Sequence, residues 1–161
     1  MQSFYTDQQQ LLAKTTREFA LSELGPKASN IDEHEIFPRE QFMSLATLGF
    51  TGLTLDSKYG GSDGNYVDMM VVIEEIASVC GSSSTVLITH VSLASQTINR
   101  FGNNEQKSRW LPDLCSGKKI AAFSLSEPQN GSDALGLATR IEKKDPNTYL
   151  LNGNKIVSSK N

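Results

Sequence analysis

One stretch of the 161-residue chain combines turn residues and hydroxyl groups at a spacing that suits a bound polar ligand. An apolar run, Ile120 to Phe123, leads into Ser124-Leu125-Ser126-Glu127-Pro128-Gln129-Asn130-Gly131-Ser132-Asp133. Pro128 fixes φ, Gly131 tolerates positive φ, and the short polar side chains can hydrogen-bond their own backbone. A strand that ends in such a loop presents hydroxyls and N–H groups at one point, which can hold a polar, partly anionic small molecule. The alternative is a surface turn that closes a hairpin.

The order of these residues resembles a known signature. Phe-Ser-Leu-Ser-Glu-Pro-x-x-Gly-Ser-Asp at 123–133 is similar to the flavin-binding signature of the acyl-CoA dehydrogenases, in which an aromatic or apolar pair precedes Thr/Ser-Glu-Pro-x-x-Gly-Ser-Asp. The resemblance extends along nearly the whole chain and includes Phe-Pro-Arg-Glu at 37–40, Tyr-Gly-Gly at 59–61 and Phe-Gly-x-x-Glu-Gln-Lys-x-x-Trp-Leu-Pro at 101–112. It implies an FAD-dependent enzyme that removes two hydrogens from the α and β carbons of an acyl-CoA thioester.

The resemblance also implies which residues contact FAD. They are Phe123, Ser124, Leu125, Ser126, Gly131, Ser132, Val157, Ser158 and Ser159. The Ser126 hydroxyl can donate to or accept from a ring heteroatom of the flavin. Gly131 is expected to permit close approach, and Ser132 to reach the CoA part of the substrate. Ser159 keeps the hydroxyl that the family places near flavin N5, whereas Val157 replaces an aromatic residue, so one flat wall beside the flavin is missing.

The same resemblance places the acyl chain of the substrate beside a helix. Thr89, His90 and Leu93 fall where the family lines its acyl-chain tunnel. That helix, expected over 85–100, mixes small and polar residues with apolar ones, and such a face can flank a cavity. His90 can also be a buried histidine with satisfied hydrogen bonds, which is the commoner case. No Cys/His spacing predicts a metal site.

No residue of the chain matches the catalytic base of the family, a glutamate from a C-terminal helical domain. Glu127 belongs to the turn signature and is not given that role, and the adjacent Glu74 and Glu75 do not face each other on a helix. We therefore expect the N-terminal part of an acyl-CoA dehydrogenase, or of the closely related oxidase, that is inactive alone. The alternative is a non-catalytic remnant or interaction subunit that packs against a partner supplying the missing half.

The spacing of apolar residues predicts an α+β fold. Apolar residues recur at helical spacing up to Ser116 and alternate from Lys118 onward. We expect an all-α domain of five or six helices over 1–117, with a break at Gly25-Pro26 and an extended segment at 50–55. Residues 118–161 are expected to begin a β-barrel-like domain. Its strands are expected at 119–126, 138–143 and 148–151, with a hairpin turn at Asn152-Gly153 leading into 155–158.

Composition argues against several other classes. A net charge of −3 without a Lys/Arg block argues against nucleic acid, and no apolar run has the length of a membrane span. Cys80 and Cys115 are expected to be reduced core residues. The N-terminus has no signal pattern, so we expect a bacterial cytoplasmic protein, or a mitochondrial matrix protein whose transit peptide has been removed. The resemblance implies electron-transfer flavoprotein as acceptor and a homo-oligomer, tetrameric in full-length family members.

Overall fold

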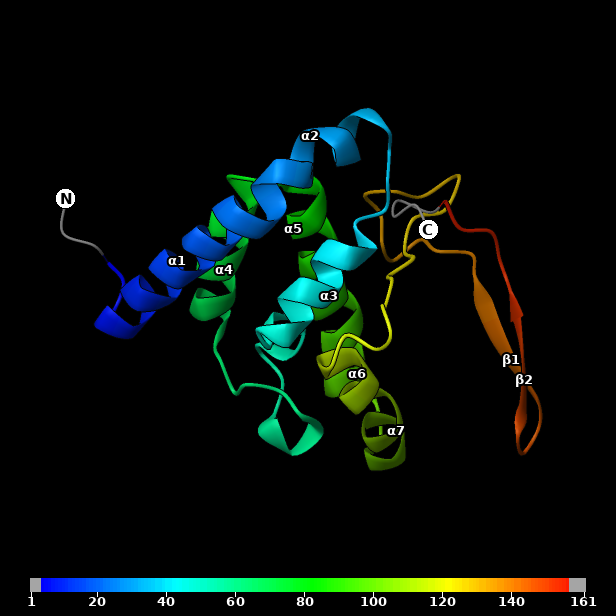
Figure 1. Cartoon of the computed structure of the whole chain (residues 1–161). Coiled ribbons are helices and arrows are strands. Elements are labelled where there is room, and N and C mark those ends of the chain that lie inside the picture. The colour runs from blue at the N-terminus through cyan, green and yellow to red at the C-terminus, as the bar shows by residue number, and fades with distance from the viewer. Residues whose placement is uncertain (1–3, 157–161) are drawn as a thin grey trace. The chain divides into compact units, whose positions relative to one another are not determined.

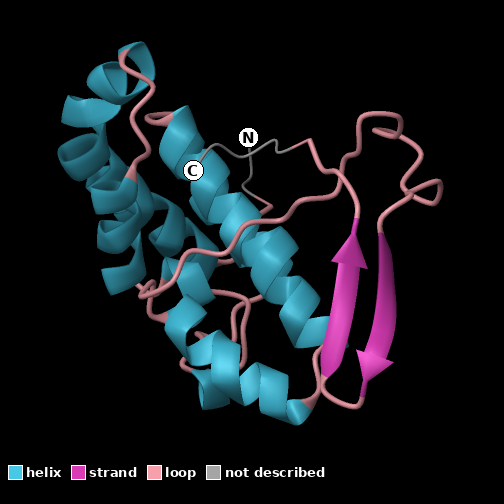
Figure 2. Ribbon diagram, turned by 90° about the vertical axis from the view of Figure 1, so that its right-hand side faces the viewer, coloured by secondary structure: helices cyan, strands magenta, loops and turns pink. Residues whose placement is uncertain are grey.

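The structure, a computed structural model, describes residues 4–156. The chain divides into two compact units, Met1–Ala122 and Phe123–Asn161, called here the helical unit and the β unit (Figure 1). The first consists of helices and their connections, and the second of loops and two strands (Figure 2). The predicted order, a helical part followed by a β part, is confirmed.

Five continuous helical rods make up the described part of the helical unit, in agreement with the five or six expected. The first and fourth each contain a π-helical turn, η1 and η4. In chain order the rods are α1 Asp7–Phe19 with η1 Ala20–Leu24 and α2 Gly25–Glu33; α3 Arg39–Thr47; α4 Tyr66–Ala77; α5 Gly81–Ile88 with η4 Thr89–Ser95 and α6 Gln96–Phe101; and α7 Asn104–Cys115.

The predicted break at Gly25-Pro26 was wrong, because the helix continues through it. In η1 the backbone N–H of Gly25 donates to the carbonyl of Ala20, five residues back. Pro26 then falls in the first turn of α2, where its fixed φ suits the helix. The wider π-helical turn thus lets a glycine-proline pair pass inside a helix.

The segment expected to be extended at 50–55 is instead a tight turn. Gly49 adopts a φ of +78° and reverses the chain after α3. The N–H groups of Leu53 and Leu55 then donate to carbonyls three residues back, those of Phe50 and Gly52. The 3₁₀ turn η2 (Phe50–Gly52) results from this local hydrogen bonding, and a second one, η3 (Ser57–Tyr59), from the N–H groups of Tyr59 and Gly60, which donate to the Asp56 and Ser57 carbonyls. All three apolar side chains of the segment are buried, so packing rather than strand pairing decides its shape.

Two apolar clusters hold the rods together. α1 packs against α4, and α4 against α5 (Figure 1). The larger cluster comprises Ala20, Leu24, Leu45, Phe50, Leu53, Met69, Val72, Ile73, Ile76, Cys80, Leu87 and Val91. The smaller one comprises Leu55, Leu111, Leu114 and Cys115. Both cysteines are buried and free, as expected. Within residues 4–156, no helix combines the length and apolarity that crossing a membrane requires.

The β unit contains one antiparallel hairpin, β1 (Arg140–Asp145) and β2 (Thr148–Asn152) (Figure 2). Ile141 lies opposite Leu151, and a bulge lies between Lys143 and Asp145. Both strands agree with the predicted ones. Every residue of the hairpin is exposed, so neither face is covered within the described residues. A two-stranded ribbon of this kind has little stability of its own.

One further β prediction was wrong. Residues 119–126 form no strand, because no strand of the described chain pairs with them; one backbone hydrogen bond, from the Ile156 N–H to the Ser126 carbonyl, links the end of this segment to residues later in the β unit. The hairpin β1–β2 turns at Pro146-Asn147, and β2 ends at Asn152, where the expected second turn, Asn152-Gly153, begins; residues 153–156 belong to no strand. At Gly153 an added Cβ would lie 2.1 Å from the Thr139 hydroxyl oxygen, so this glycine serves close packing. The remainder of the strand expected at 155–158 extends outside the described residues.

Gly61→Ala should destabilise the helical unit by about 1–3 kcal/mol, the usual cost of overpacking. Its Cβ would lie 2.0 Å from the Leu55 carbonyl oxygen and 2.9 Å from that of Gly52, and neither backbone group can move freely. Gly81→Ala is the matched control, because an added Cβ there meets nothing within 4 Å. Urea unfolding followed by helical circular dichroism measures both changes. Equal stability of the two variants would contradict this packing.

Candidate functional site

The Ser-Glu-Pro signature folds into a tight turn. Glu127 and Asn130 exchange backbone hydrogen bonds, with N···O distances of 2.9 and 3.1 Å, around Pro128 and Gln129. Proline at the second turn position is favoured because its φ is already set. The Asn130 side chain donates to the Gly136 carbonyl, and the Asp133 carboxylate accepts from the N–H groups of Leu135 and Gly136. The expected local bonding of these two side chains is therefore confirmed.

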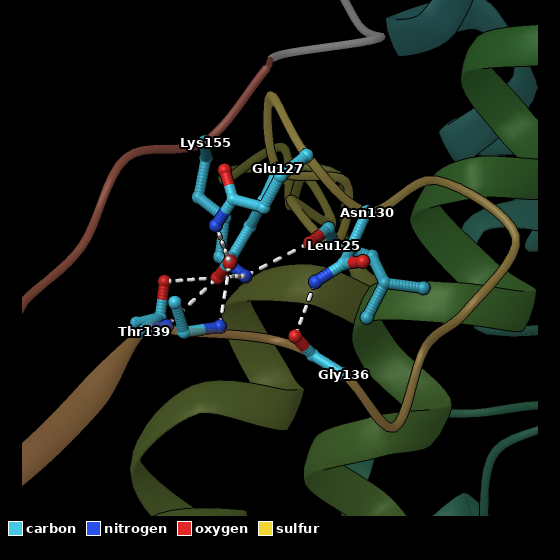
Figure 3. Close-up of polar contacts among 8 residues, drawn as sticks. Leu125, Glu127, Asn130, Gly136, Thr139 and Lys155 are labelled. Atoms are coloured by element: carbon cyan, nitrogen blue, oxygen red, sulfur yellow. Dashed lines mark hydrogen bonds and ion pairs between the residues drawn. The ribbon is translucent and has the colours of Figure 1, made fainter.

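Glu127 lies inside the turn, and its carboxylate collects donors from three parts of the chain (Figure 3). The backbone N–H groups of Ala138 and Thr139 donate at 2.6 and 2.9 Å, and the Thr139 hydroxyl donates as well. The ammonium of Lys155 lies 3.0 Å away and also donates to the Leu125 carbonyl at 2.8 Å. The Gln129 amide adds a fifth donor at 3.1 Å.

These donors decide the ionisation of Glu127. The hydrogen bond from the Thr139 hydroxyl and those from the backbone at 138–139 lower the pKa of the carboxyl to about 2, with Lys155 acting in the same direction. The residue is only 2% exposed. A general base needs a free lone pair within reach of the substrate proton, and here the oxygens are already occupied. Glu127 is a structural carboxylate, in agreement with its exclusion from catalysis on sequence grounds.

The outer side of the same turn is open. Ser124, Leu125 and Ser132 are exposed, and the Ser126 hydroxyl has no hydrogen-bond partner among residues 4–156. An added Cβ at Gly131 would meet nothing within 4 Å. Phe123 is half-buried. Free hydroxyls and uncovered backbone on one side of a rigid turn fit a polar planar ligand such as FAD.

The second expected flavin patch, Val157, Ser158 and Ser159, lies outside the described residues. The chain just before it is described: Ile156 donates its N–H to the Ser126 carbonyl, and Lys155 reaches Leu125 and Glu127. Sequence reasoning gave Lys155 and Thr139 no role. They lie 28 and 12 residues from Glu127, and no local pattern links them to it. The sequence held one signal for such a contact, Glu127 itself. It is the only ionisable residue of the turn at 127–130, and a carboxylate requires a counter-charge once it is buried.

The residues expected beside the acyl chain lie on the π-helical turn η4 of the helical unit. Thr89 is half-buried and Leu93 is 47% exposed, one helical turn apart. His90, between them in sequence, is fully buried against Phe42, with ring centroids 4.9 Å apart in an edge-to-face arrangement. The structure therefore separates the three: two reach the surface of the helical unit, and the third lies in its interior.

Both ring nitrogens of His90 are used inside the helical unit. Nε2 lies 3.1 Å from the Leu114 carbonyl, and Nδ1 accepts from the backbone N–H of Ala121 at 3.0 Å. One acceptor and one donor suit the neutral imidazole with its proton on Nε2. Burial lowers the pKa of His90 to about 4, against the opposing effect of the Leu114 carbonyl. This is the satisfied buried histidine that the sequence left as an alternative.

Comparison with known proteins gives the family. Residues 6–118 match the model of the acyl-CoA dehydrogenase N-terminal domain, which is more than half of the chain. The chain belongs to the acyl-CoA dehydrogenase family. The family assignment made from the sequence is thereby confirmed; the signature at 123–133 itself lies just after the part that the family model covers.

Individual relatives cover almost all of this chain. The short-chain specific acyl-CoA dehydrogenase of Clostridium acetobutylicum is 36% identical over 151 residues, 94% of this chain and 40% of the relative. A solved chain described as electron transferring flavoprotein of Acidaminococcus fermentans has a TM-score of 0.88 at 32% identity, over 97% of this chain and 41% of its own. The structure of an acyl-CoA dehydrogenase complexed with FAD from Bacillus anthracis has a TM-score of 0.85 at 33% sequence identity. The match covers 94% of this chain and 26% of that one. This acyl-CoA dehydrogenase family chain thus spans about 40% of the curated relative's length.

The burial of neutral His90 should make stability depend on pH. Unfolded histidine takes up a proton below its usual pKa of 6.5, whereas folded His90 does so only near 4, so its contribution to stability falls as pH drops from about 6.5 to 4. His90→Gln should be less stable than wild type at pH 7, and the gap should shrink by up to about 3 kcal/mol at pH 4.

Urea unfolding at pH 7, 6, 5 and 4 measures this gap. His34→Gln is the matched control, because His34 is exposed and bonds only the Asn30 carbonyl of its own helix. Its profile should run parallel to that of wild type. A His90→Gln profile equally parallel to wild type would contradict the neutral, buried assignment of His90.

Proposed function

We propose that this chain is the N-terminal part of an FAD-dependent acyl-CoA dehydrogenase, with a helical domain at 1–117 and the start of a flavin-binding β domain at 118–161. The observation that carries the proposal is the signature at 123–133. Its turn is held from the inside by the Glu127 carboxylate, while its hydroxyls and backbone stay open on the other side. Membership of the family and the FAD complex of the Bacillus anthracis relative support it.

The open side of the turn would hold the flavin. Phe123, Ser124 and Leu125 would lie along the isoalloxazine, with the Ser126 hydroxyl bonded to a ring heteroatom and Gly131 leaving room for close approach. When bound, FAD supplies the redox chemistry by accepting the hydride from the acyl β carbon. The chain supplies orientation through fixed backbone and hydroxyl groups. Val157, Ser158 and Ser159 would add the second set of contacts.

The substrate would be an acyl-CoA thioester. Ser132, exposed on the outer side of the turn, would contact its CoA part. Thr89 and Leu93 would contact the acyl chain, with His90 as the buried support behind them. A short-chain thioester is the first choice as a probe, because the Clostridium acetobutylicum relative is described as short-chain specific.

The electron acceptor would be an electron-transfer flavoprotein, and the working form a homo-oligomer. The Acidaminococcus fermentans chain described as electron transferring flavoprotein supports a connection to that electron carrier. The expected location is the bacterial cytoplasm or the mitochondrial matrix, following the family resemblance.

Ser126→Ala should weaken FAD binding by about 0.5–1.5 kcal/mol, or roughly 2- to 12-fold in Kd, the usual value of one neutral hydrogen bond. The Ser126 hydroxyl has no partner among residues 4–156, so its removal should leave the fold unchanged. Ser108→Ala, on the exposed surface of α7, is the control for the same chemical change. Titration of the apo-protein with FAD, followed by flavin fluorescence, measures both. An affinity equal to that of the Ser108 variant would count against the assignment.

The 161-residue chain loaded with FAD should not bleach when a short-chain acyl-CoA is added without oxygen. Bleaching requires a base that removes the α proton, and Glu127 is buried and fully hydrogen-bonded. Co-expression with the C-terminal helical half of a short-chain relative should restore bleaching. Steady bleaching by the 161 residues alone would show that a base exists among them. No FAD binding in either form would overturn the proposed function.

A further inference from the structure

Lys155 and Ile156 are fastened to the Ser-Glu-Pro turn by three hydrogen bonds. Lys155 donates to the Leu125 carbonyl at 2.8 Å and to the Glu127 carboxylate at 3.0 Å, and Ile156 donates its N–H to the Ser126 carbonyl at 2.9 Å. Three successive residues of the signature are therefore bound to two successive residues about 30 positions later. These contacts fix the register of the two segments, and Figure 3 shows the two that Lys155 makes.

The contacts of Lys155 and Ile156 with residues 125–127 are called here the clamp, and the Glu127 carboxylate extends the clamp to a third segment. Its oxygens accept from Ala138 and Thr139, directly before β1 begins, at the same time as from Lys155. One carboxylate thus joins the signature, the start of the hairpin and the residues after it. Because the group is ionised and only 2% exposed, any displacement of one segment would remove donors that compensate the burial of the charge.

The clamp leaves the outer side of the signature free. Ser126 uses only its backbone carbonyl for the contact with Ile156, so its hydroxyl stays available. Leu125 likewise offers its carbonyl to Lys155 and keeps its side chain exposed. The contacts that fix the backbone are therefore distinct from the groups that would touch a ligand.

We propose that Glu127 and Lys155 are positioning residues for the flavin. They hold the backbone of the flavin-contacting residues Leu125 and Ser126 in a fixed register with Lys155 and Ile156. This inference rests on the proposed function, since it concerns the same flavin site. Neither residue touches the flavin in this scheme; both act through the backbone that carries Leu125 and Ser126.

The carboxylate charge is what the arrangement requires. In Glu127→Gln one acceptor oxygen becomes an N–H₂ group that faces other donors, and Lys155 loses its counter-ion. Lys155→Met removes the ammonium and keeps most of the apolar stem. The matched controls are Glu142→Gln and Lys144→Met, because these two residues form an exposed ion pair with each other in the same β unit.

The experiment has two readouts on the full chain. Without FAD, amide hydrogen exchange at Ala138 and Thr139 should be about ten- to a hundredfold faster in Glu127→Gln than in wild type. With FAD, the Kd of Glu127→Gln and Lys155→Met should rise about tenfold or more, and the visible circular dichroism of the bound flavin should change. Glu142→Gln and Lys144→Met should match wild type in both. Far-UV circular dichroism confirms that each variant retains its helices at the temperature used.

The outcomes separate this inference from the proposed function. If Glu127→Gln exchanges faster but binds FAD with unchanged affinity and spectrum, Glu127 is structural only and the inference is overturned. Unchanged exchange would overturn it too, and so would an equal loss of affinity in the Glu142 and Lys144 controls. If Glu127→Gln does not fold, Lys155→Met decides the question alone by the same two readouts. Failure of wild type itself to bind FAD would overturn the proposed function, and the inference with it.

Discussion

The β unit depends on one buried negative charge. A carboxylate that is shielded from water needs donors to replace its lost hydration, and those of Glu127 are two backbone N–H groups, the Thr139 hydroxyl, the Lys155 ammonium and the Gln129 amide. The hairpin β1–β2 buries neither of its faces in the described chain. Polar contacts around a single side chain, rather than an apolar core, therefore give this unit its defined shape.

The helical unit also buries an ionisable side chain, but there the surroundings stabilise its neutral form. His90, like Glu127, is almost inaccessible to solvent, but its polar neighbours are one carbonyl and one N–H, which suit a neutral ring. Burial therefore lowers its pKa and removes the charge, whereas the donors around Glu127 lower the pKa there and retain the charge. The balance of donors and acceptors, not burial alone, decides which form is stable. His90 also links α7 to Ala121, and so orders the chain that leads out of the last helix.

The sequence predicted what depends on local spacing. Helices with apolar stripes, the two strands of the hairpin, and the side-chain turns of Asn130 and Asp133 all follow from residues close to one another in the chain. The predictions from the sequence failed where contacts between residues far apart in the chain determine the local structure. Residues 119–126 alternate like a strand but find no partner strand in the described chain, and the close packing of Gly153 against Thr139 joins residues 14 positions apart. The link from Glu127 to Lys155 could not be predicted, because nothing local joins them.

These features explain how one short signature can serve two tasks. Ser126 and Glu127 are neighbours in different surroundings: the Glu127 carboxylate has five donors, whereas the Ser126 hydroxyl has no partner among residues 4–156. The inward carboxylate fixes the turn, and the outward hydroxyl remains free for a ligand. A search for a catalytic acid or base would select Glu127 first, as the ionisable residue of the tight turn at 127–130. Its burial and its five donors make it unsuited to exchange a proton, so the base of an acyl-CoA dehydrogenase reaction must come from a different residue.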